Sequence, residues 1–106
     1  MEKFTKYMEL LEGEIPGVAG ELGEFKDQAS REAMSFITES KQDLIKWTSA
    51  LTSGQLSAAD FEWLLKSKKD LLKLNGLKAA GLAHIQADKF RDQVLSLVID
   101  KASNHF

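Results

Sequence analysis

Residues 22–51 read LGEFKDQASREAMSFITESKQDLIKWTSAL, and apolar side chains recur there at intervals of three and four residues. They form one stripe, with Ser40 as its polar exception: Leu22, Phe25, Ala29, Ala33, Phe36, Leu44, Trp47 and Leu51. The pattern repeats after about eleven residues, which averages about 3.67 residues per turn and matches a nearly straight α-helix. The stretch therefore predicts a helix with one buried face.

The same stripe continues toward the N-terminus through apolar residues in phase with it: Val18, Ile15, Leu11, Met8 and Phe4. We therefore expect a helical first arm over residues 3–52. Pro16 lacks a backbone N–H and disfavours a helical residue before it, so the arm should kink near Pro16 or restart there. Glycines gather in the same region, at positions 13, 17, 20 and 23, and indicate a flexible or tightly packed bend.

A second helical segment starts near the middle of the chain. Gly54 follows Thr52 and Ser53 and predicts the end of the first arm. Ser57 and Asp60 then have the spacing of a capping box, with Ser57 as the N-cap. The stripe that follows is broken only by Lys68: Phe61, Leu65, Leu72, Gly76, Ala79, Ala83, Ala87, Phe90, Val94 and Val98.

The phase of this second stripe does not change at Asn75-Gly76, so we predict one long helix over residues 57–103. The alternative is a break at Asn75-Gly76 and a compact bundle of shorter helices. A continuous helix would be stabilised by Gly76→Ala, whereas a turn at Gly76 would be destabilised by it. Gly81→Ala is expected to be tolerated in either case.

The fold class is therefore all-α, because no stretch alternates polar and apolar residues as a strand does. The chain of 106 residues is expected to form a single helical domain, residues 1–106. We predict a long antiparallel helical hairpin with arms at about 3–52 and 57–103.

The second arm carries a further apolar face about opposite its first stripe: Trp63, Leu74, Leu77, Ile85, Leu95 and Ile99. A helix that is apolar on two sides is normally covered on two sides. We therefore predict a homo-oligomer, most simply a two-fold homodimer that completes a four-helix bundle through these residues. Leu77→Asp combined with Ile85→Asp should then dissociate it. The alternative is a monomer in which residues 1–12 cover part of this face.

Composition excludes several classes of protein. The chain has no cysteine, so disulfides and cysteine chemistry are absent. Fourteen Lys and Arg against sixteen Asp and Glu give no basic excess for nucleic acid. No apolar run approaches the about 20 residues of a transmembrane helix, and residues 1–6 do not resemble a signal peptide. We expect a cytoplasmic location.

Candidate chemistry is sparse. His84 and Asp88 are four residues apart on one helical face, a spacing that suits a metal ligand pair, but a solvated polar pair is the favoured interpretation. The acidic residues between positions 9 and 24 are expected to keep the surface soluble, and no serine has the Gly-x-Ser-x-Gly setting of a hydrolase. We predict no enzyme and no catalytic, cofactor-binding or metal-binding residue.

A lysine cluster lies beside Trp63 and consists of Lys66, Lys68, Lys69 and Lys73. It is either a patch for an anionic partner or a solvated face. The neighbouring carboxylates of Asp60, Glu62 and Asp70 favour the solvated face.

A helical hairpin of about one hundred residues with Trp47 near its turn is similar to the WXG100-type secreted proteins. The turn lacks the Trp-x-Gly motif, and no Tyr-x-x-x-Asp/Glu sequence follows near the C-terminus. Three functions stay open on the sequence. The first is a non-catalytic interaction or scaffold protein, the second a small secreted or carrier-type hairpin, and the third a bundle that binds an apolar ligand.

Overall fold

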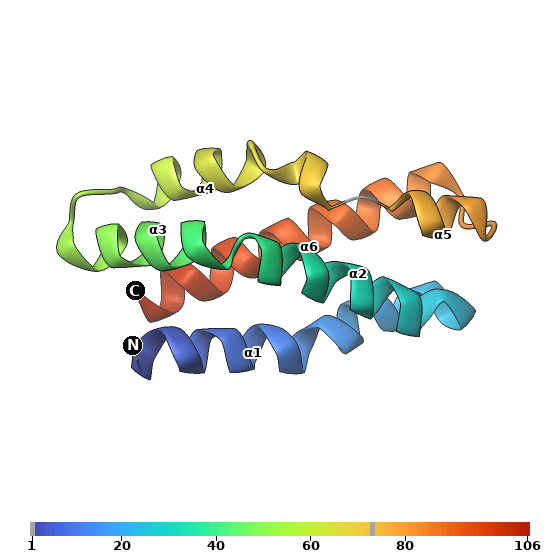
Figure 1. Ribbon diagram of the computed structural model, residues 1–106, viewed down its shortest axis with the longest axis horizontal. Coiled ribbons are helices and arrows are strands. Elements are labelled where there is room, and N and C mark those ends of the chain that lie inside the picture. The colour runs from blue at the N-terminus through green and yellow to red at the C-terminus, as the bar shows by residue number, and fades with distance from the viewer. Residues whose placement is uncertain (1, 73) are drawn as a thin grey trace.

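The computed structural model describes residues 2–72 and 74–106, and these residues contain helices and connecting turns with no strand (Figure 1). This confirms the all-α class. The helices in chain order are α1 (Glu2–Ala19), η1 (Gly20–Phe25), α2 (Lys26–Glu39), α3 (Lys41–Ser53), α4 (Ala58–Lys66), η2 (Lys69–Leu71), α5 (Asn75–Ala79) and α6 (His84–His105), where η marks a 3-10 helix. None of these helices is long and apolar enough to cross a membrane.

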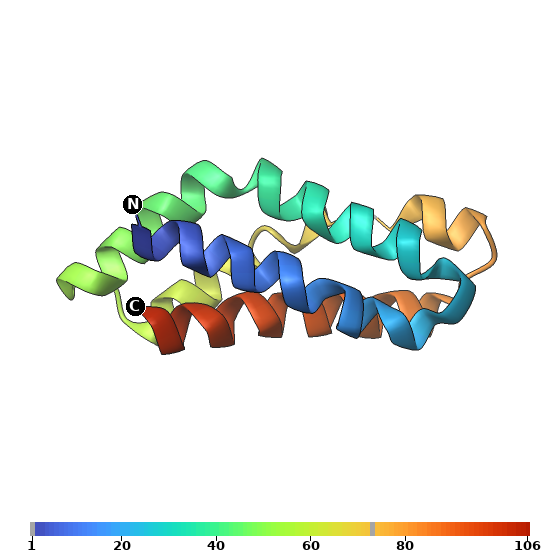
Figure 2. The same ribbon diagram turned by 90° about the horizontal axis from the view of Figure 1, so that it is seen from below.

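The helices form four antiparallel legs around one core (Figures 1 and 2). The first leg is α1, and α2 followed by α3 returns beside it. The third leg is α4 followed by α5, and α6 returns as the fourth, next to both α1 and α4. Both termini lie at the same end of the molecule. One chain thus supplies the four-helix arrangement that we had expected from two chains.

The first arm is not a single helix kinked at Pro16. α1 continues past Pro16 to Ala19, and the chain reverses in η1, where Gly23 has a φ of 59°. Pro16 removes the hydrogen bond to the carbonyl of Glu12, whose residue is exposed, so water can satisfy that oxygen. Glycine reaches a positive φ at no steric cost, so the reversal occurs at Gly23.

The long second helix over residues 57–103 is also wrong. α4 ends at Lys66, α5 covers five residues, and α6 begins at His84 after a turn in which Gly81 has a φ of 113°. The break is not at Asn75-Gly76, because α5 starts at Asn75. The molecule measures 44 × 23 × 19 Å with a radius of gyration of 13.8 Å. A 57–103 helix alone would extend about 70 Å.

Two local predictions are confirmed. Gly54 caps α3 with a φ of 79°, in the left-handed conformation that favours glycine. Ser57 caps α4: its hydroxyl accepts a hydrogen bond from the Asp60 backbone N–H at 3.1 Å, and the Asp60 carboxylate accepts from the Ser57 N–H at 3.5 Å. The connection between the second and third legs therefore lies where the sequence indicated.

The core contains the stripe residues of the first half together with apolar residues from α4, α5 and α6. Tyr7 is fully buried between α1 and α6, and its ring meets those of Phe4 and Phe106. Its hydroxyl donates a hydrogen bond to the Val98 carbonyl at 2.9 Å. Burial raises the pKa of Tyr7 above its usual range, so the phenol stays protonated at neutral pH.

Candidate functional site

The six residues of the predicted oligomer face do not form one surface. Leu74, Leu77 and Leu95 are buried in the core of the single chain, and Ile99 is half-buried against it. Trp63 is 71% exposed and Ile85 is 84% exposed. The helix is interrupted before and after α5, and Leu74 and Leu77 face the core of the single chain. The continuous apolar face that a straight helix would have presented is therefore absent from the described residues.

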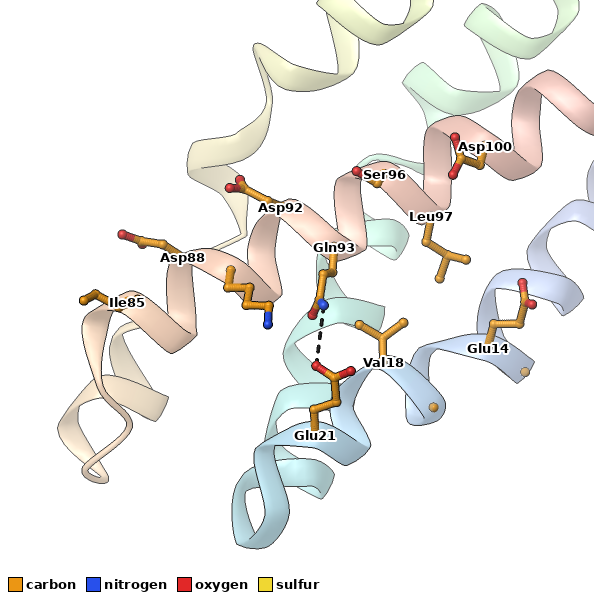
Figure 3. Close-up of a pocket in the computed structure, with 13 residues that line it drawn as sticks. Glu14, Val18, Glu21, Ile85, Asp88, Asp92, Gln93, Ser96, Leu97 and Asp100 are labelled. Atoms are coloured by element: carbon orange, nitrogen blue, oxygen red, sulfur yellow. Dashed lines mark hydrogen bonds between the residues drawn. The ribbon is translucent and has the colours of Figure 1, made fainter.

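A groove of about 1060 Å³ lies between α1 and α6 (Figure 3). Its apolar surface comes from Val18 on α1 and from Ile85 and Leu97 on α6. Figure 3 shows the side chains of Val18 and Leu97 between the two helices. We call this depression the α1–α6 groove.

Acidic side chains surround the groove. Glu14 lines it from α1 and Glu21 from η1, while Asp88, Asp92 and Asp100 line it from α6, with Lys89 as the one basic lining residue. The three aspartates and Ser96 recur every four residues along α6, so they lie along one side of that helix. The groove therefore combines an apolar floor with negatively charged edges.

Several of these carboxylates have cationic neighbours from outside the groove. Lys101 lies 3.0 Å from Glu14, and Arg91 lies 3.8 Å from both Asp88 and Asp92. Lys78 lies 4.0 Å from Asp88. These cations offset most of the negative charge of Glu14, Asp88 and Asp92 at the groove.

Glu21 and Asp100 have no cationic partner among the described residues. Glu21 instead accepts a long hydrogen bond from the Gln93 amide, at 3.5 Å, across the groove (Figure 3). Asp100 is exposed at the other end of the groove, near Leu97. Unpaired charge is therefore present on both walls.

The α1 wall contains two glycines, Gly13 and Gly17, with open space where a side chain would project. Gly13 and Gly17 are exposed, and a Cβ added at either would meet nothing within 4 Å outside its own helix. Glycine inside a helix costs about 1 kcal/mol relative to alanine. Packing within the chain does not require either glycine, and together they leave the α1 backbone uncovered along the groove.

His84 and Asp88 are both exposed, and the cations near Asp88 are Lys78 and Arg91. No group of three or more potential metal ligands is present in the part of the chain that the structure describes. The arrangement at His84 is that of a solvated side chain at the start of α6.

The lysine cluster is divided by the fold. Lys66 donates a hydrogen bond to Glu62 at 2.8 Å, and Lys68 lies 3.2 Å from Asp43 of α3. Lys69 is exposed, and Lys73 lies outside the described residues. The two ion pairs agree with a solvated face rather than a concentrated anion-binding patch.

The sequence did not predict the α1–α6 groove. The glycine spacing and the acidic residues near the N-terminus were visible, and so were the aspartates that interrupt the second face of α6. What was missing was the reversal at η1, which folds α2 back beside α1. The comparison with protein-family models, curated proteins and solved structures found no match to this chain.

Proposed function

We propose that the chain is a non-catalytic helical interaction protein that binds its partner in the α1–α6 groove. The observation that supports this most directly is the groove itself, where Val18 and Leu97 stay accessible beside the uncovered backbone of Gly13 and Gly17, and Ile85 is exposed at the other end. A helix-sized apolar groove with a polar rim is a common surface for docking another helix.

The shape of the groove favours a macromolecule over a small apolar ligand. Small-molecule sites usually enclose most of the ligand surface, whereas this groove is open along its length. Its acidic residues lie at exposed positions along the rim. The interaction function is therefore better supported than the apolar-ligand alternative.

Self-association stays a proposal, and it now rests on the exposure of Trp63 and Ile85 alone. Sedimentation equilibrium at micromolar concentration tests it. A homodimer that is weakened by Trp63→Ser would support it, and a clean monomer of 11.8 kDa would contradict it. The cytoplasmic location and the carrier-type alternative also remain predictions, and cell fractionation separates them.

Site-specific crosslinking tests the groove as the binding surface. A photoreactive amino acid is placed at Gly17 in the groove, and in a second protein at Gln42 on the exposed side of α3. We expect a discrete protein adduct from position 17 that is absent from position 42 and is suppressed by a leucine at Gly13. Equal adducts from the two positions would contradict the proposal.

A further inference from the structure

The length of the α1–α6 groove sets the size of what it holds. On α6 the lining residues run from Ile85 to Asp100, which corresponds to about 22 Å of helix axis, or about four turns. On the opposite wall they run from Gly13 in α1 to Glu21 in η1. A partner helix of about 15 residues matches this length.

The glycines set how closely that helix approaches. Gly13 and Gly17 are one turn apart on α1, so their uncovered backbone forms one continuous strip along the wall. A residue without a side chain lets another backbone come near. Val18 and Leu97 lie beside this strip and offer apolar contact to the same helix.

The edges of the groove set the charge of the partner. Five carboxylates and one lysine line it. Glu14, Asp88 and Asp92 pair with cations from outside the groove, and the negative charge left open to a partner is that of Glu21 and Asp100, which have no cationic partner among the described residues. Lysines or arginines on an incoming helix would approach both walls, whereas an acidic or phosphate-bearing partner would be repelled.

A second copy of the chain fits less well. Outside the groove, α4 is the described helix that presents a strongly exposed large apolar side chain, Trp63, next to a lysine, Lys66. Lys66 is already paired with Glu62 at 2.8 Å, and Asp60 lies on the same exposed part of α4. That edge therefore carries little net positive charge to place against the groove.

We infer that the α1–α6 groove binds a basic amphipathic helix of another protein, with apolar side chains on Val18, Leu97 and Ile85 and basic side chains toward Glu21, Asp92 and Asp100. This inference rests on the proposed function, because it specifies the partner of the same groove. It names the chemistry of the partner helix: about four turns, one apolar face and flanking positive charge.

Fluorescence anisotropy with a labelled peptide tests the inference. The peptide has about 15 residues, with leucines at helical spacing and lysines elsewhere. Two further peptides serve as controls, one with glutamine in place of every lysine and one with the same composition in scrambled order. We expect the lysine peptide to bind most tightly, and its affinity to fall as salt is raised.

Two kinds of variant locate the binding. Gly17→Leu fills the groove without a clash at its Cβ and should weaken peptide binding by roughly tenfold or more, whereas Gln42→Leu should not.

Asp92→Asn with Asp100→Asn should weaken peptide binding by roughly five- to tenfold at low salt. Glu39→Gln with Asp27→Asn removes the same charge outside the groove and should have little effect. Thermal unfolding confirms that each variant is folded.

The outcomes separate the inference from the proposed function. Equal binding of the glutamine peptide, or binding unaffected by Gly17→Leu, would overturn the basic helix as the partner. A homodimer that Gly17→Leu dissociates would also overturn it, while the groove would remain an interaction surface. If no peptide binds and position 17 gives no specific crosslink, the proposed function fails as well.

Discussion

The hydroxyl of Tyr7 donates a buried hydrogen bond to the main-chain carbonyl of Val98, 91 positions further along the chain, at 2.9 Å. It joins the first helix to the last near the two termini (Figure 2). The α1–α6 groove lies along the same pair of helices. The contact that fixes α1 against α6 therefore also helps to set the geometry of the groove.

Tyr7→Phe keeps the ring and removes this hydrogen bond. We expect it to lower the free energy of unfolding by about 1 kcal/mol, the usual net value of a buried hydrogen bond. Urea denaturation measures the change. Tyr7→Ala should cost about 3–5 kcal/mol because it also empties the ring site. A Tyr7→Phe variant as stable as the natural chain would show that the hydrogen bond contributes nothing net.

Leu77 and Ile85 belonged to the same predicted oligomer face, and the structure now separates them. Leu77 is fully buried, so Leu77→Asp should cost at least about 3 kcal/mol or prevent folding, since it buries an unpaired carboxylate. Ile85 is 84% exposed in the first turn of α6, so Ile85→Asp should change stability by less than about 0.5 kcal/mol.

Circular dichroism during urea unfolding measures both variants at a concentration where the chain is monomeric. Similar small effects from the two substitutions would contradict the buried position of Leu77. A large loss of stability from Ile85→Asp would show that Ile85 is covered in solution.

The structure changes the expectation for Gly81→Ala, which the sequence predicted to be tolerated. Gly81 has a φ of 113°, so Gly81→Ala should cost about 1–2 kcal/mol of backbone strain. Gly76 has no positive φ, and its added Cβ would come within 2.9 Å of the Gln28 amide nitrogen and 3.0 Å of a Glu32 oxygen. These are the ends of flexible side chains, so Gly76→Ala should change stability by less than about 1 kcal/mol.

Thermal unfolding of the two alanine variants side by side makes this comparison. A tolerated Gly81→Ala together with a strongly destabilising Gly76→Ala would restore the turn at Gly76 and contradict the position of α5.

Hydrophobic periodicity predicted many of the buried residues of the first half, although it missed Tyr7 and Ile37, which are fully buried. Ala29, Ala33, Phe36 and Leu44 are all in the core, and the polar exception, Ser40, is buried at the junction of α2 and α3. Periodicity reports the path of the chain less well. Leu22 and Phe25 stay in phase through η1 although the chain reverses there.

The second half shows the same limit. Its predicted stripe is correct at Phe61, Leu65, Leu72 and from Ala87 onward, but Gly76, Ala79 and Ala83 are exposed. Leu74, Leu77 and Leu82 fill the core instead. Small residues fit either a closely packed helix or an exposed turn, so phase alone could not choose between them. The groove depends on this tertiary path, and the sequence could supply only its separate parts.

Glu32 links the stability of this bundle to pH. One oxygen of its carboxylate is buried and has no hydrogen-bond partner among the described residues. Burial raises the pKa of Glu32, although a hydrogen bond from Gln28 and the charge of Arg31 act in the opposite direction. The ionised carboxylate is therefore less favourable in the folded chain than in the unfolded one.

The sign of the pH effect follows from that shift. When a carboxyl has a higher pKa in the folded chain, its contribution to stability decreases as pH rises from the ordinary glutamate pKa of about 4.3 through the raised pKa.

Glu32→Gln keeps the shape of the side chain and removes its charge. We expect the variant to be more stable than the natural chain at pH 7, with the difference shrinking toward pH 4. Urea denaturation at both pH values measures the difference, and Glu39→Gln, at an exposed position on the same helix, is the matched control. A Glu32→Gln difference that does not depend on pH, or that matches the Glu39→Gln difference, would show that burial of this carboxylate has no cost.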